Sequence, residues 1–219
     1  MVTTRAIGIV GVAYGDMPLE EMATRTAELG FDHLDASIHL VDALDDDAIA
    51  ALPVPIADRI SGFDVVDGCT SMALYERRDE DRFDETVALF RAHPTARMEP
   101  GPRSSAGSIE KIKALVAAVP GLRLTLDTGH VAAWGEDPVE VLRYADHVQL
   151  RQAAPGRPQL HPDEGGDVDF AAVLAELDRL DYRGKVSIEY FDLPELKWGL
   201  DDPVGHSVAL AAHVRALMR

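Results

Sequence analysis

The chain alternates short apolar runs typical of β-strands with segments of helical periodicity, and this alternation constrains its fold most strongly. Repeated strand–helix units build a parallel sheet that helices cover. The 219 residues hold about eight such units, which suits a (β/α)8 barrel of roughly 200–250 residues. The sequence therefore predicts an α/β fold: a (β/α)8 TIM barrel, in a compact variant with a reduced N-terminal half, formed by residues 1–219 as a single domain.

The expected elements follow from the apolar spacing and from Gly and Pro stop signals. The expected strands are 6–12, 31–36, 54–59, 63–68, 95–99, 122–127, 146–150 and 185–190. The expected helices are 19–29, 43–52, 83–93, 108–119, 138–144, 170–180 and 204–218. The third and fourth strands are the weakest, because little room remains for a helix between them. Residues 151–166 are expected to form a long loop.

The chain is acidic, with a net charge of −17 at pH 7. Such a surface repels phosphate backbones and anionic membranes, so we expect a small-molecule substrate, no nucleic acid and no membrane partner. No apolar run reaches the ~18 residues of a membrane helix, and the N-terminal apolar run is broken by glycines, unlike a signal peptide. A cytoplasmic location is the simplest expectation. The single cysteine, Cys69, excludes an intrachain disulfide and a cysteine-based zinc site.

Four polar residues lie at or near the ends of successive expected strands: Glu99, Asp127, Gln149 and Glu189. In a (β/α)8 barrel the active site lies at the C-terminal ends of the strands, and strand alternation places these side chains on one face. Three buried carboxylates repel one another unless a cation is present, and a divalent metal with oxygen ligands removes that conflict. Taken singly, each carboxylate is equally well explained by a helix cap or an arginine partner.

Further candidates surround these strand ends. Gly129 permits a tight turn after Asp127, which would fold His130 back over the barrel mouth as a substrate contact or additional ligand rather than a surface loop histidine. His147 is expected to be a packed, hydrogen-bonded core histidine. Arg151 and Arg157 lie in the expected loop, where they either neutralise a substrate oxyanion or phosphate or are simply solvated.

Five segments occur in a characteristic order. They are Arg97-Met98-Glu99-Pro100, Leu124-Thr125-Leu126-Asp127-Thr128-Gly129-His130, His147-Val148-Gln149-Leu150-Arg151, Glu164-Gly165-Gly166-Asp167-Val168-Asp169-Phe170 and Val186-Ser187-Ile188-Glu189-Tyr190-Phe191. This ordered set resembles the xylose isomerase-like barrel superfamily, which includes sugar and sugar-phosphate isomerases, ketose 3-epimerases and the endonuclease IV enzymes. The resemblance covers residues 95–192 well, and the first 90 residues only in general pattern.

The resemblance implies a divalent metal, Mn2+, Mg2+ or Co2+, held by Glu99, Asp127 and Glu189. The family's fourth ligand is a histidine, and Gln149 stands at that position, so this chain departs from the pattern. An amide oxygen is a weaker ligand than imidazole for the softer metals, so metal binding is weakened, shifted towards Mg2+ or Mn2+, or lost. The endonuclease branch uses more histidine ligands, which this chain lacks.

The resemblance also implies substrate contacts from His130 and from Arg157. The function it favours is an isomerase or epimerase of a small sugar or hydroxy-carbonyl compound, acting by metal-assisted proton transfer through an enediolate. Glu99 and Glu189 would be the catalytic acid/base pair, and a positive donor such as His130 would stabilise the developing oxyanion. Related barrels often pair, so a homodimer is one option.

Two other functions remain open. One is a different metal-dependent hydrolase or lyase on the same barrel, because a fold does not fix its chemistry. The other is a non-catalytic ligand-binding accessory protein, for which the glutamine at position 149 is the main argument.

Overall fold

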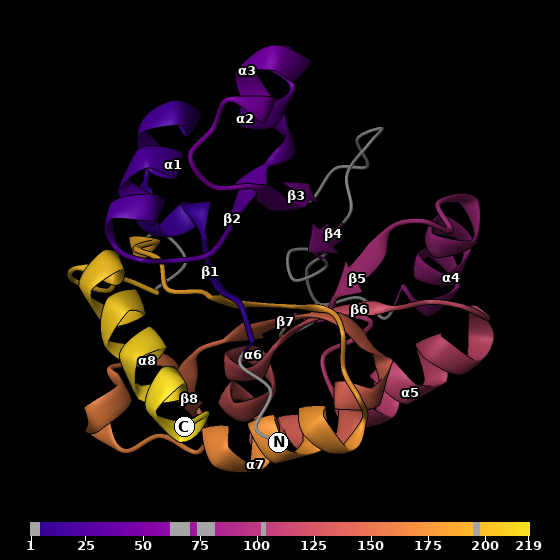
Figure 1. Cartoon of the computed structure of the whole chain (residues 1–219). Helices are drawn as coiled ribbons and strands as arrows, with labels where there is room; N and C mark the ends of the chain where they lie inside the picture. Colours follow the sequence, from indigo (N-terminus) through magenta and orange to yellow (C-terminus); the bar gives the residue numbers. More distant parts are fainter. Residues whose placement is uncertain (1–4, 62–70, 74–81, 102–103, 195–197) are drawn as a thin grey trace.

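The computed structural model describes residues 5–61, 71–73, 82–101, 104–194 and 198–219, with the backbone alone at 71–73. Its parallel strands form a closed barrel in the order β1-β10-β7-β6-β5-β4-β3-β2 (Figure 1). The strands are β1 Ile7–Val10, β2 Leu34–Ser37, β3 Ile56–Ser61, β4 Ser71–Ala73, β5 Arg97–Glu99, β6 Leu124–Asp127, β7 Ala145–Leu150 and β10 Lys185–Ile188. The expected (β/α)8 barrel is therefore confirmed.

Helices surround the strands (Figure 1). The α-helices are α1 Leu19–Glu28, α2 Ile38–Val41, α3 Asp46–Ala50, α4 Phe83–Ala92, α5 Ile109–Ala118, α6 Thr128–Ala133, α7 Phe170–Arg179 and α8 Pro203–Leu217. Single 3-10 turns or helices are η1 Gly11–Tyr14, η2 Pro138–Tyr144 and η3 Pro162–Glu164. None of the described helices is long and apolar enough to cross a membrane.

Local sequence signals start the main helices. The Ser108 hydroxyl accepts a hydrogen bond from the Lys111 N–H at 3.2 Å and caps α5, and the Asp169 carboxylate caps α7 in the same way through Ala172 at 3.0 Å. Each such cap contributes about 1 kcal/mol. Apolar residues three or four apart then face the barrel, and each fully buried one contributes roughly 1.5–3 kcal/mol.

The structure differs from the expected elements in three places. Helix α6 begins directly after Asp127, so the expected tight turn at Gly129 is wrong. The expected loop 151–166 contains an antiparallel hairpin of β8 Gln152–Ala154 and β9 Arg157–Leu160. The expected strand 63–68 lies outside the described residues, and the fourth barrel strand is β4.

A layer of charged side chains crosses the barrel interior below the strand ends. His147 is 1% exposed, and its Nε2 lies 2.8 Å from Asp35 Oδ2 while its Nδ1 lies 3.5 Å from Asp58 Oδ2. Arg97 Nη2 donates to Asp58 Oδ1 at 2.5 Å, and the Ser187 hydroxyl lies 3.2 Å from His147 Nε2. The expected packed, hydrogen-bonded histidine is confirmed, and it joins β2, β3 and β7.

Because Asp35 and His147 form a buried ion pair, the free energy of unfolding depends on pH. Burial would lower the pKa of His147, but the charge and hydrogen bond of Asp35 raise it above its ordinary value. Burial likewise opposes ionisation of Asp35, yet His147 holds the pKa of Asp35 below its ordinary value. The histidine's contribution is therefore complete below pH ~6.5, its unfolded pKa, and is lost as pH rises through the higher folded pKa.

Replacing His147 with Gln should remove this pH dependence. At pH 6 the variant should lose roughly 3–5 kcal/mol of stability, because it leaves Asp35 buried without its cation. On raising the pH above the folded pKa of His147, the wild-type Tm should fall towards that of the variant, whose own profile should be flatter. Thermal unfolding followed by circular dichroism measures both, with the exposed His39→Gln as control. Parallel pH profiles of the wild type and His147→Gln would contradict the assignment.

Candidate functional site

The C-terminal ends of β5, β6 and β10 bring three carboxyl groups together inside the barrel mouth. Glu99 ends β5, Asp127 ends β6, and Glu189 directly follows β10. All three are buried, with Asp127 fully enclosed. The structure thus brings together the three carboxylates that the strand pattern placed on one face.

Arg151 lies within this cluster. It directly follows β7, is fully buried, and donates a hydrogen bond from Nη2 to Asp127 Oδ2. Its Nη2 is also 4.0 Å from Glu189 Oε2. The guanidinium carbon lies 4.7 Å from the centre of the Phe191 ring, within the range of a cation–π contact. The arginine expected in a loop is therefore a core residue of the site.

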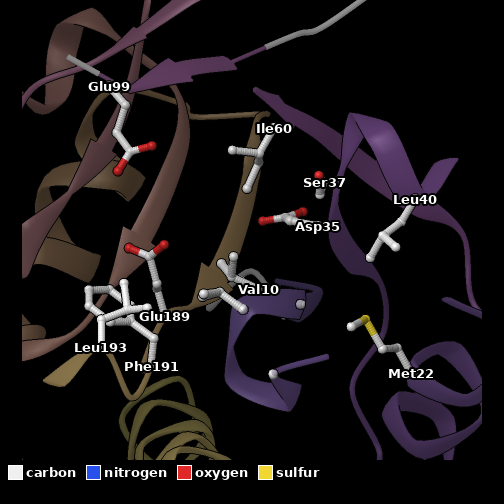
Figure 2. A pocket seen from close by; sticks show the side chains of 13 residues that line it. Val10, Met22, Asp35, Ser37, Leu40, Ile60, Glu99, Glu189, Phe191 and Leu193 are labelled. Atoms are coloured by element: carbon white, nitrogen blue, oxygen red, sulfur yellow. The ribbon is translucent and has the colours of Figure 1, made fainter. Parts of the chain in front are cut away.

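Glu99 and Glu189 face a cavity of about 310 Å³. Residues of β1, β2 and β3 form another part of its wall. Figure 2 shows their carboxyl groups pointing towards each other, with Asp35 on the opposite side. The remaining described lining is mostly apolar: Val10, Val12, Met22, Leu40, Ile60, Phe191 and Leu193, with Gly11, Gly15 and Ser37. The cavity can hold a small organic molecule against two carboxyl groups.

The carboxyl groups differ in their protonation. Burial, reinforced by the charge of Asp127, raises the pKa of Glu99 to about 8. Burial, together with the charges of Glu99 and Asp127, raises the pKa of Glu189 well above its ordinary value. Burial would also raise the pKa of Asp127, but the Arg151 guanidinium outweighs it and holds that pKa low. The site therefore contains one ion pair, between Asp127 and Arg151, and two glutamates whose protonated form is favoured by burial.

His130 lies in α6, close to two of the carboxyl groups. Its Nδ1 donates to the Pro100 carbonyl at 2.9 Å, and its Nε2 is 3.4 Å from Asp127 Oδ2. Burial lowers the pKa of His130 to about 4, against the opposing effect of Asp127, so the imidazole is neutral. This low pKa disfavours the positive charge expected at His130, and Arg151 is the cation beside Asp127.

Gln149 and Arg157 have different surroundings. Gln149 is fully buried in β7, paired in register with Asp127, and neither its Oε1 nor its Nε2 has a hydrogen-bond partner among the described residues. Arg157 lies on the exposed face of β9, where it forms an ion pair with Glu164 at 3.3 Å. The structure therefore places Gln149 in the cluster and Arg157 outside it. Cys69 lies outside the described residues.

The side chains present do not fit a divalent metal. Such an ion needs several oxygen ligands at roughly 2.0–2.6 Å. In Asp127, the expected central ligand, Oδ1 accepts the Gly129 N–H at 2.7 Å and Oδ2 accepts the Arg151 guanidinium. Across the described part of the chain, no group of three His, Cys, Asp or Glu side chains is arranged to hold a metal.

One ionisable residue of the cavity wall was missed by the sequence patterns: Asp35, a buried residue of β2. Arg151 was a candidate for neutralising a substrate oxyanion, but it was expected in a loop. The alternation of His147 and Gln149 continues to Arg151 by one more step of two, and this rule would have placed it inside the barrel.

Known structures share this fold. A D-psicose 3-epimerase from Clostridium cellulolyticum H10 is 13% identical with a TM-score of 0.73, covering 98% of this chain and 99% of its own. The 3-keto-D-glucoside 4-epimerase from E. coli is 16% identical with a TM-score of 0.70, covering 97% and 100%. A probable 3-DHS dehydratase from Bacillus anthracis is 12% identical with a TM-score of 0.66, covering 98% and 97%.

At these identities the likeness concerns the fold, and no curated protein matches the chain in sequence. The family model described as xylose isomerase-like TIM barrel matches residues 4–211, nearly the whole chain. The order of its strands, the carboxyl cluster at their ends and this match agree: the chain belongs to the xylose isomerase-like TIM barrel family.

Proposed function

We propose that this protein is an isomerase or epimerase that moves a proton on a small, uncharged sugar or hydroxy-carbonyl compound. The observation that carries the proposal is the pair of buried glutamic acids, Glu99 and Glu189, which face each other across one end of a closed-in cavity. Epimerases among the structures of this fold are consistent with such chemistry.

The two glutamates divide the acid and base roles. A hydrogen on the carbon beside a carbonyl group is removed by an ionised carboxylate, and a protonated carboxyl group delivers a proton to the other side of that carbon or to its neighbour. The pKa of Glu99 is about 8 and that of Glu189 lies well above its ordinary value, so both groups hold a proton more tightly than ordinary glutamates. One of the two acts as the base in its ionised form while the other, protonated, acts as the acid, and the roles exchange in the reverse direction.

The developing negative charge on the substrate needs a nearby positive charge. Arg151, which does not itself line the cavity, supplies it at a distance: its guanidinium lies 4.0 Å from Glu189 and is removed from water. A fixed cation in a site without water stabilises an enediolate more strongly than solvated charge does. The neutral His130 cannot play this part.

The chemistry of the cavity wall favours an uncharged substrate. Among the described lining residues the ionisable ones are all acidic, namely Asp35, Glu99 and Glu189. A phosphate group would meet these carboxyl groups with no described Lys or Arg in the lining. The apolar wall from β1 to β3 instead suits the C–H face of a sugar or a short carbon chain.

Isotope exchange tests the acid–base pair directly. In D2O, the wild type should introduce deuterium beside the carbonyl of at least one unphosphorylated ketose from a panel of C4 to C6 sugars, as measured by NMR. Glu99→Gln and Glu189→Gln should each slow this exchange by at least about 10²-fold, since an amide cannot transfer the proton. The exposed Glu140→Gln, with its partner Lys113, serves as control.

Retention of the fold by each variant is checked by circular dichroism. Exchange that survives both substitutions, or its absence for the wild type across the whole panel, would refute the proposal; the second result would favour the accessory function.

The charge preference provides a separate test. For any ketose that is turned over, kcat/KM should be lower for its phosphate ester by about tenfold or more, equivalent to ~1.4 kcal/mol, because the described lining offers a dianion the Asp35 carboxylate and no cation. Steady-state kinetics on matched pairs of free and phosphorylated sugar measures this ratio. Equal or higher efficiency with the ester would show that residues outside the described lining bind phosphate.

A further inference from the structure

Arg151 is the largest fully buried side chain among the described residues, and neighbouring residues contact both its backbone and its guanidinium. Its backbone N–H donates to the Thr128 hydroxyl at 3.1 Å, and that hydroxyl lies 3.3 Å from the Arg151 carbonyl oxygen. The Phe191 ring covers the guanidinium at 4.7 Å. The side chain is thus fixed at its base and covered at its tip.

Gly129 makes the space for this side chain. A Cβ atom at position 129 would lie 2.7 Å from Arg151 Nε and 3.0 Å from Arg151 Cβ, closer than real side chains approach. The φ angle of Gly129 is not in the left-handed region, so no turn requires glycine there. The close approach of Arg151 is therefore the physical reason for glycine at this position.

The guanidinium also interacts with carboxyl oxygens that would otherwise be free to coordinate a metal. Both oxygens of Asp127 accept N–H hydrogen bonds, one from Gly129 and one from Arg151. Glu189 lies 4.0 Å from the same Nη2 atom. The buried Arg151 guanidinium therefore already lies within ion-pair distance of two of the three carboxyl groups to which a divalent ion would bind, those of Asp127 and Glu189.

From these contacts we infer that the Arg151 guanidinium is the resident cation of this site and takes the place of a divalent metal, so that the protein neither contains nor requires one. The inference goes beyond the proposed function, because it concerns which cation balances the carboxylates whatever reaction they perform. The Nε and Nη1 atoms of Arg151 have no hydrogen-bond partner among the described residues.

Metal content and Mn2+ binding test this inference without any substrate. The wild type, purified without chelator, should contain far less than one equivalent of transition metal by elemental analysis. Neither EDTA nor MnCl2 should change its Tm, and calorimetric titration with MnCl2 should show no saturable heat. A stoichiometric metal, or micromolar Mn2+ binding by the wild type, would overturn the inference whether or not the variants fold.

Variants at position 151 test whether Mn2+ can bind at this site once the Arg151 guanidinium has been removed. Arg151→Ala removes the cation and frees the Asp127 oxygen, so Mn2+ should now bind and raise the Tm by roughly 5–10 °C at about 100 times the dissociation constant. Arg151→Lys keeps a positive charge and should stay insensitive to Mn2+. Arg157→Ala, which removes an exposed arginine, is the matched control and should behave as the wild type. A folded Arg151→Ala protein that ignores Mn2+ would overturn the inference.

Discussion

The ion pair between Asp127 and Arg151 is the interaction on which the rest of this site depends. Three carboxyl groups converge at the barrel mouth, and a single fully buried guanidinium balances them. A buried pair adds little net stability, but removing one partner costs roughly 3–5 kcal/mol because the other charge is left without compensation. The pair also sets the protonation of its neighbours. With Asp127 held ionised, its negative charge adds to the effect of burial in raising the pKa of Glu99 and of Glu189.

The inward face of β7 explains how so many charges fit inside one barrel. His147, Gln149 and Arg151 point inward at three successive levels. The lowest level is an ion-pair layer with Asp35 and Asp58, and the highest is the ion pair with Asp127. His147, whose pKa Asp35 raises, and Arg151, directly after the strand, thus face acidic residues of the other strands. The uncharged glutamine separates the two levels, which keeps the cations of this strand apart.

The barrel and the carboxyl cluster could be predicted from the sequence because each rests on a local period. Alternation of two in the strands placed Glu99, Asp127 and Glu189 on one face, and the structure brings them together. Arg151 was a candidate for neutralising an oxyanion, but its burial inside the barrel was not predicted, because residues after position 150 were expected to form a loop. The hairpin that follows was missed for the related reason that its strands are short and turn at Gly156. A protonation state such as that of His130 depends on burial, which no local pattern encodes.

The contact between Gly129 and Arg151 has a consequence for how this chain can change over generations. A larger residue at 129 would force the Arg151 side chain to move, because a Cβ atom there would lie 2.7 Å from Arg151 Nε. Moving the guanidinium would disturb the ion pair with Asp127. The effects of substitutions at 129 and 151 should therefore depend on each other, so that a side chain at 129 is better tolerated when residue 151 is small.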